Sequence, residues 1–297
     1  MFLSATLLAL TPLPGPPDPP PVARYRRVIE RSLERRGNSL ESIDLWVDHS
    51  TWENAWEVES RHYSVRTTAS RALAKNVADG LEAMFEHFGS ILGSSYDPST
   101  KVPVWIFPTL AEYNNFGDNH GAEHSSLLGA FWASGHPEQP IVCYYDPNQT
   151  LLLMWLTHAA SHQYVQAAFG QTPPTFVDEG LASYFSLYWD LSYGGREHQR
   201  LRDRSYTDLE DLINEGLGNY RPDSHSRFMQ LGMLFNYLLH YREETALVDD
   251  GEQPEASFAD YLRALVRGDS TNGLGFEIYM ELIDAVDADF RNFDFPQ

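Results

Sequence analysis

Two histidines, His158 and His162, stand four positions apart in the middle of the chain. In an α-helix, residues four apart lie on one face about one turn from each other, so both imidazoles can reach the same ion. A carboxylate that could join them, Glu179, follows in the next segment. Two imidazoles and a carboxylate occupy three corners of a tetrahedron and leave the fourth for water, as in a catalytic zinc site. We therefore predict a zinc site formed by these three side chains.

The residue directly after the first histidine is alanine, Ala159. The H-E-x-x-H motif of zinc peptidases has a glutamate at this position. That glutamate takes a proton from the zinc-bound water as the water attacks a carbonyl group. Alanine has no proton acceptor, and loss of a positioned base lowers the rate by about 10²–10⁴-fold. We expect poor peptide hydrolysis, unless another carboxylate such as Glu123 or Asp178 acts as the base through a water molecule.

A longer signature surrounds these residues: two histidines, a glutamine, a proline-containing turn, and then E-G-x-A-x-Y-F. Its positions in this chain are His158, His162, Gln163, Pro174, Glu179, Gly180, Ala182, Tyr184 and Phe185. The signature resembles the gluzincin group of zinc metallopeptidases, and especially a bacterial branch of that group. A looser similarity at residues 59–68 extends the resemblance over most of residues 55–245. The resemblance implies a zincin-like α+β fold, with an N-terminal mixed-sheet lobe, an active-site helix and a C-terminal helical lobe.

Further residues are candidates for supporting the site. Metal-bound imidazoles usually donate their second nitrogen to an oxygen acceptor, and Ser183 could be that acceptor or could simply pack between helices. Tyr184 is a second candidate from the same segment. An oxyanion stabiliser could reach in from the helical lobe, and for this role we consider His225, Tyr220 and Tyr237.

A second short motif lies at residues 120–124, which read His-Gly-Ala-Glu-His. This order formally matches the inverted zinc motif H-x-x-E-H, which must lie on a helix. The surrounding residues 114–126 are polar and glycine-rich, so we expect a loop there. We assign the motif an accessory role near the cleft at most.

The predicted site needs two helices to hold it. We expect the first at residues 150–169, capped by Asn148 or Thr150 and stopped by Gly170. The second begins near Phe176, and Gly180 and Ala182 would let it approach a neighbour closely. Strands are expected at residues 43–47, 58–67, 102–107, 127–132 and 141–145. Other helices are expected at residues 70–92, 228–241, 258–266 and 276–286.

The order of these elements, strands first and helices later, favours an α+β architecture. We divide the chain into a leader or proline-rich linker (1–22), a sheet lobe (23–170) and a helical lobe (171–297) that supplies Glu179. The strand at 127–132 is a candidate edge strand, along which a peptide could lie by strand addition.

The charge and composition of the chain limit the classes of partner that it can bind. The net charge of −21 opposes binding to nucleic acid or to an anionic membrane. Residues 2–10 are apolar and could form a signal segment for export to the periplasm or medium, although no basic residue precedes Arg24. The segment is too short to span a bilayer, so we expect no stable membrane insertion, and a cytoplasmic location stays open. The single cysteine, Cys143, excludes an intrachain disulfide.

Three interpretations of the site remain open. The chain could be a zinc-binding protein with impaired peptidase chemistry that serves as a peptide-binding module or a scaffold. It could be a working hydrolase with a substitute base, acting on a peptide or protein. It could also be a relic of the fold that binds no ion, although the presence of all three ligand types speaks against this. The sequence does not indicate the oligomeric state.

Overall fold

The computed structural model describes residues 48–119, 130–132, 139–204, 206–214, 224–241, 257–268 and 283–295. The chain divides into two compact units, residues 1–55 and 56–297. Of the first unit, the described part holds one short 3₁₀ helix, η1 (Trp52–Asn54). The predicted strand at 43–47 lies outside the described residues. The lobe boundaries that we predicted at residues 22 and 170 stay predictions.

A five-stranded mixed sheet is formed by the described strands of the second unit, in the order β1-β2-β3-β5-β4. Strands β2, β3 and β5 run parallel, with Val65 opposite Val104 and Val104 opposite Ile141. Both outer strands, β1 and β4, are antiparallel to their neighbours. The strand bounds are β1 (Trp56–Glu59), β2 (Tyr63–Thr67), β3 (Val102–Phe107), β4 (Ala130–Trp132) and β5 (Ile141–Tyr144).

Most of the expected strands are confirmed, with one difference. The segment expected as a single strand at 58–67 is a hairpin, because the chain turns at residues 60–62 and Ser60 N–H donates to the carbonyl oxygen of Tyr63. The strand expected at 127–132 is β4, which lies at the edge of the sheet as predicted.

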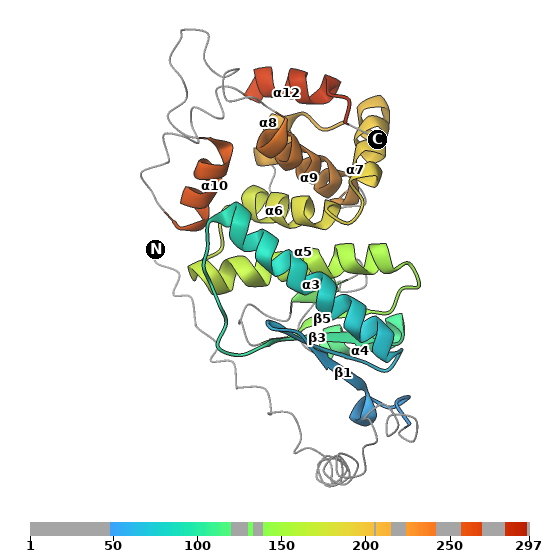
Figure 1. Ribbon diagram of the computed structural model, residues 1–297. Helices are drawn as coiled ribbons and strands as arrows, with labels where there is room; N and C mark the ends of the chain where they lie inside the picture. The colour runs from blue at the N-terminus through green and yellow to red at the C-terminus, as the bar shows by residue number, and fades with distance from the viewer. Residues whose placement is uncertain are drawn as a thin grey trace, which may run out of the picture. The chain divides into compact units, whose positions relative to one another are not determined.

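Two long helices, α3 (Arg71–Leu92) and α5 (Gln149–Phe169), lie against the sheet (Figure 1). Each begins at a side-chain cap and ends at a glycine with positive φ, and for α5 both ends were expected from the sequence. Ser70 caps α3 and Asn148 caps α5, each by accepting the backbone N–H three residues later. Thr150, the alternative cap, lies inside α5. Caps at both ends make the bounds of these two helices well defined.

The expected loop at 114–126 is wrong for its first part, because α4 (Leu110–Asn119) is a helix. Tyr113, fully buried, and Phe116 pack with Val142 on the face of the sheet opposite α3. Burial of these apolar side chains outweighs the weak helix propensity of the asparagines and glycine in the segment. Residues 120–124, and with them the H-x-x-E-H motif, lie outside the described residues.

The remaining helices lie on the other side of α3 and α5 from the sheet (Figure 1). Their bounds are α6 (Thr175–Leu187), α7 (Leu191–Arg204), α8 (Leu209–Asn214), α9 (Ser224–His240), α10 (Phe258–Val266) and α12 (Ile283–Asn292). The expected helices at 228–241 and 258–266 are confirmed, although α9 begins four residues earlier. Of the expected helix at 276–286, only 283–286 are described, and they belong to α12.

Small residues set the spacing of α6, α7 and α9. A Cβ atom at Gly180 would come within 2.4 Å of the Phe235 ring, and one at Gly232 would come within 2.9 Å of the backbone of Ser183. The close approach expected of Gly180 is therefore confirmed, with α9 as the neighbour. No helix among the described residues is both long and apolar enough to cross a membrane.

Candidate metal centre

The candidate site is built by two consecutive helices, α5 and α6. Helix α5 carries His158 and His162 one turn apart, and it ends at Gly170, where φ is +72°. A short turn containing Pro174 leads into α6, which packs against α5 and carries Asp178 in its first turn and Glu179 next to it. The turn thus folds the carboxylates back toward the two imidazoles.

Three side-chain atoms converge between these helices. The Nε2 atoms of His158 and His162 lie 3.3 Å apart. The Oε2 atom of Glu179 lies 3.2 Å from Nε2 of His158 and 3.6 Å from Nε2 of His162. Among the residues that the structure describes, this is the group of three metal-ligating side chains whose atoms come together in this way. The cluster could therefore hold a metal ion.

The carboxylate of Glu179 fits this role. Its Oε2 atom is buried and accepts no hydrogen bond of good geometry. Buried polar oxygens normally have a partner, so an unpartnered oxygen beside two imidazole nitrogens fits a site for a cation. Burial alone would raise the pKa of Glu179, but the two imidazoles of His162 and His158 together outweigh this effect and lower the pKa.

The second nitrogen of His162 is held by Asp178. Its Nδ1 atom lies 3.0 Å from Oδ2 of Asp178, and both side chains are about four-fifths buried. Burial alone would lower the pKa of His162, but the negative charges of Glu179 and Asp178 raise it to about 9. Because a hydrogen bond at Nδ1 directs Nε2 outward, Asp178 aims the imidazole at the point where the three atoms meet.

Of the two roles that we considered for Ser183, the structure supports packing between helices. Its buried hydroxyl has no hydrogen-bond partner among the described residues, so it accepts a hydrogen bond from neither imidazole. Ser183 instead packs at the crossing of α6 and α9, against Gly232. Sequence reasoning missed Asp178 as the partner of His162, although its position beside Glu179 was a usable signal. It also missed Phe228 of α9, whose ring lies 5.9 Å from the His158 ring, edge to face.

The other predicted site residues lie as follows. Ala159 follows His158 on α5 and is buried, with 2% of its surface exposed. The Tyr184 hydroxyl lies 2.7 Å from Nε2 of His240, and burial raises the pKa of Tyr184 to about 12. Tyr237 packs its ring against Phe293 of the C-terminal segment. The roles that we considered for these two tyrosines stay predictions.

The remaining candidates cannot be placed by their side chains. His225 lies in the first turn of α9, but its side chain is outside the described part of the structure. Tyr220 and Glu123 are also outside it. Their proposed roles stay predictions.

Comparison with known proteins gives no assignment. No protein-family model matches the chain, and no curated protein matches its sequence. The chemistry of the site therefore rests on its own geometry.

Proposed function

We propose that this chain is a zinc-binding protein of gluzincin type, in which His158, His162 and Glu179 hold the ion and peptide hydrolysis is impaired. The observation that carries the proposal is the convergence of two Nε2 atoms and one Oε2 atom between α5 and α6. The match between these residues and the gluzincin signature supports the same assignment.

The spacing of the three atoms favours zinc. A tetrahedral ion with bonds of ~2.05 Å separates its ligand atoms by ~3.35 Å. The three observed separations, 3.2, 3.3 and 3.6 Å, lie around that value. An octahedral Mg²⁺ ion with bonds of ~2.05 Å would place adjacent ligands roughly 2.9 Å apart, which is shorter than all three. Two imidazoles are also a donor set that suits zinc better than Mg²⁺.

The impairment follows from the side chains around this point. Zinc, when bound, would lower the pKa of a coordinated water and polarise a substrate carbonyl. Ala159 offers no proton acceptor for that water. Asp178 lies on the Nδ1 side of His162, and the converging atoms lie on the Nε2 side. This orientation disfavours Asp178 as a substitute base. It therefore favours a non-catalytic, peptide-binding role for the chain.

The proposal also covers partner and compartment. A peptide or protein is the ligand that the gluzincin resemblance implies, and the apolar N-terminal segment suggests export to the periplasm or medium.

The test begins with metal analysis of the purified chain, which should contain one zinc per molecule. The His158→Ala, His162→Ala double variant should contain none, whereas His240→Ala, at an exposed histidine outside the cluster, should retain it.

Activity is then measured on a mixed peptide library. The natural chain should bind peptides or cleave them very slowly, and Ala159→Glu should cleave them faster. Ordinary peptidase rates in the natural chain, with no gain in Ala159→Glu, would mean that a substitute base exists. Full zinc retention in the double-histidine variant would mean that the metal site lies elsewhere.

A further inference from the structure

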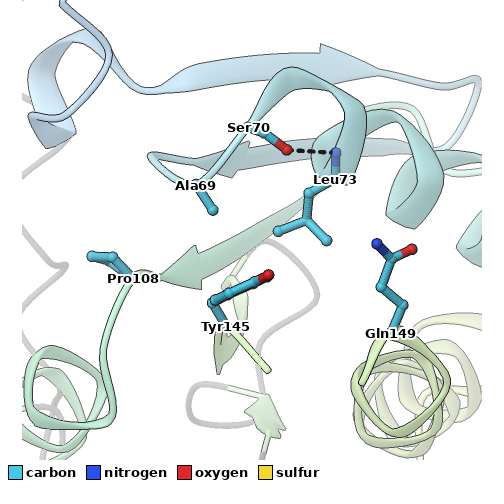
Figure 2. Close-up of a pocket in the computed structure, with 6 residues that line it drawn as sticks. All are labelled: Ala69, Ser70, Leu73, Pro108, Tyr145 and Gln149. Atoms are coloured by element: carbon cyan, nitrogen blue, oxygen red, sulfur yellow. Dashed lines mark hydrogen bonds between the residues drawn. The ribbon is translucent and has the colours of Figure 1, made fainter. Parts of the chain in front are cut away.

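A pocket of about 440 Å³ opens at the carboxyl ends of the parallel strands β2, β3 and β5 (Figure 2). Its lining comes from the segments that follow these three strands. The lining residues are Ala69, Ser70, Leu73, Pro108, Tyr145 and Gln149. Ligands of parallel sheets bind at this edge, and the volume lies within the range of small-molecule sites.

The pocket is separate from the histidine cluster. Gln149 is the first residue of α5, and His158 follows more than two turns later, roughly 13 Å along the helix axis. Because a helix turns 100° per residue, the two residues also point to opposite faces of α5. A ligand in the pocket would therefore be bound independently of a metal in the cluster.

The walls of the pocket are fixed by the sheet. The backbone N–H of Tyr145 donates to the carbonyl oxygen of Phe107 at 2.7 Å, which continues the β3–β5 pairing past the end of β5. The side chains of Tyr145 and Gln149 extend toward Leu73, which is almost fully buried (Figure 2). Ala69 and Pro108 complete an apolar wall beside the Tyr145 ring. The positions of these walls are therefore set by the sheet and by the start of α3 and α5.

Three polar side chains line the pocket, and each has a hydrogen to donate. The Ser70 hydroxyl oxygen accepts the N–H of Leu73 at 3.1 Å, and its own hydrogen remains to be donated. The Gln149 carbonyl oxygen accepts an N–H of Asn76 at 3.3 Å, so its NH₂ group remains to donate. The Tyr145 hydroxyl is a third donor. None of the lining residues carries a charge.

We propose that this pocket binds a small uncharged molecule that carries a carbonyl oxygen on an aromatic or aliphatic body. The body contacts Ala69, Leu73, Pro108 and the Tyr145 ring, and the carbonyl oxygen accepts from the Tyr145 hydroxyl or the Gln149 amide group. A carboxylate is disfavoured because the lining offers no cation to compensate its loss of hydration. The net charge of −21 also repels anions.

Benzamide is a suitable probe, because it is neutral and joins a ring to a carbonyl group. In a ¹H–¹⁵N NMR titration of the full chain, benzamide should shift the backbone amides of Ser70, Leu73, Tyr145 and Gln149. A ligand of this size should bind with a Kd on the order of 1 mM. The Tyr145→Phe, Gln149→Leu double variant should weaken binding roughly 30-fold, since it loses two hydrogen bonds of about 1 kcal/mol each.

Matched controls use residues of the same types outside the pocket. Tyr188→Phe, at an exposed tyrosine, and Gln166→Leu should leave the Kd unchanged. Ala69→Trp adds bulk from an exposed position and should block binding while the amide spectrum of the core stays intact. The proposal is overturned if benzamide leaves the four amides unshifted at ten times the expected Kd. It is also overturned if benzoate binds more tightly, or if benzamide binds the double variant or Ala69→Trp as well as the natural chain.

Discussion

Removal of the Asp178 carboxylate should weaken zinc binding without removing any of the three ligands. Asp178 Oδ2 lies 3.0 Å from Nδ1 of His162, and both groups are largely withdrawn from solvent. In Asp178→Ala the imidazole loses the acceptor that fixes its tautomer and ring angle. Loss of such a partner typically costs 10- to 100-fold in metal affinity, which is about 1.4–2.7 kcal/mol.

Two further variants separate this role from a general effect on helix α6. Asp178→Asn retains an oxygen that can accept from Nδ1 but lacks the charge, so its loss should be smaller than that of Asp178→Ala. Asp211 is also an acidic residue in the first turn of a helix, α8. Asp211→Ala should therefore lower the free energy of unfolding by about 0.3–1 kcal/mol, the general cost of losing an acidic residue at a helix N-terminus. It should leave the zinc affinity unchanged.

The assay is competition for zinc against a chromogenic chelator at fixed pH and ionic strength, with thermal unfolding of each variant measured in parallel. A zinc Kd for Asp178→Ala within about twofold of the natural chain would refute the orienting role that the 3.0 Å contact implies. Equal losses in Asp178→Ala and Asp178→Asn would show that the charge, and not the acceptor, carries the effect.

The other predictions concern activity, packing and pH. Ala159→Glu should raise peptide turnover by about 10²–10⁴-fold if the rest of the site is competent, as measured on a peptide library. Gly180→Ala should lower the free energy of unfolding in urea by roughly 1–3 kcal/mol, because its Cβ would lie 2.4 Å from Phe235. Burial holds the pKa of His198 at about 4. The pKa of His198 is lower in the folded state than in the unfolded state. Neutral His198 therefore contributes fully to the free energy of unfolding above pH 6.5, and this contribution is lost as the pH falls toward 4. By pH 5 the loss should be roughly 2 kcal/mol, and urea unfolding of His198→Gln should lack this part of the pH dependence.

The features that sequence reasoning found are those coded locally. Helix α5 could be predicted because Asn148, Gly170 and the apolar spacing between them all act within one segment. Strand β3 could be predicted because its bounds follow from a continuous apolar run ended by Pro108. His158 and His162 share a face of one helix, so their convergence also follows from local geometry.

The features that it missed depend on contacts between distant segments. Helix α4 forms in a polar, glycine-containing segment because Tyr113 and Phe116 are buried against β5. Helix α7 contains Gly194, where a Cβ would come within 2.6 Å of Met233 of α9. The pairing of Asp178 with His162 depends on the angle between α5 and α6, which packing sets and no local pattern encodes.

The most direct test of the metal assignment is a crystal of the zinc-loaded chain, with anomalous diffraction recorded on both sides of the zinc absorption edge. Our account predicts one peak at roughly 2.0–2.2 Å from Nε2 of His158, Nε2 of His162 and Oε2 of Glu179. A chain that shows no anomalous peak between these atoms at saturating zinc, or one whose bound zinc lies on other side chains, would contradict it.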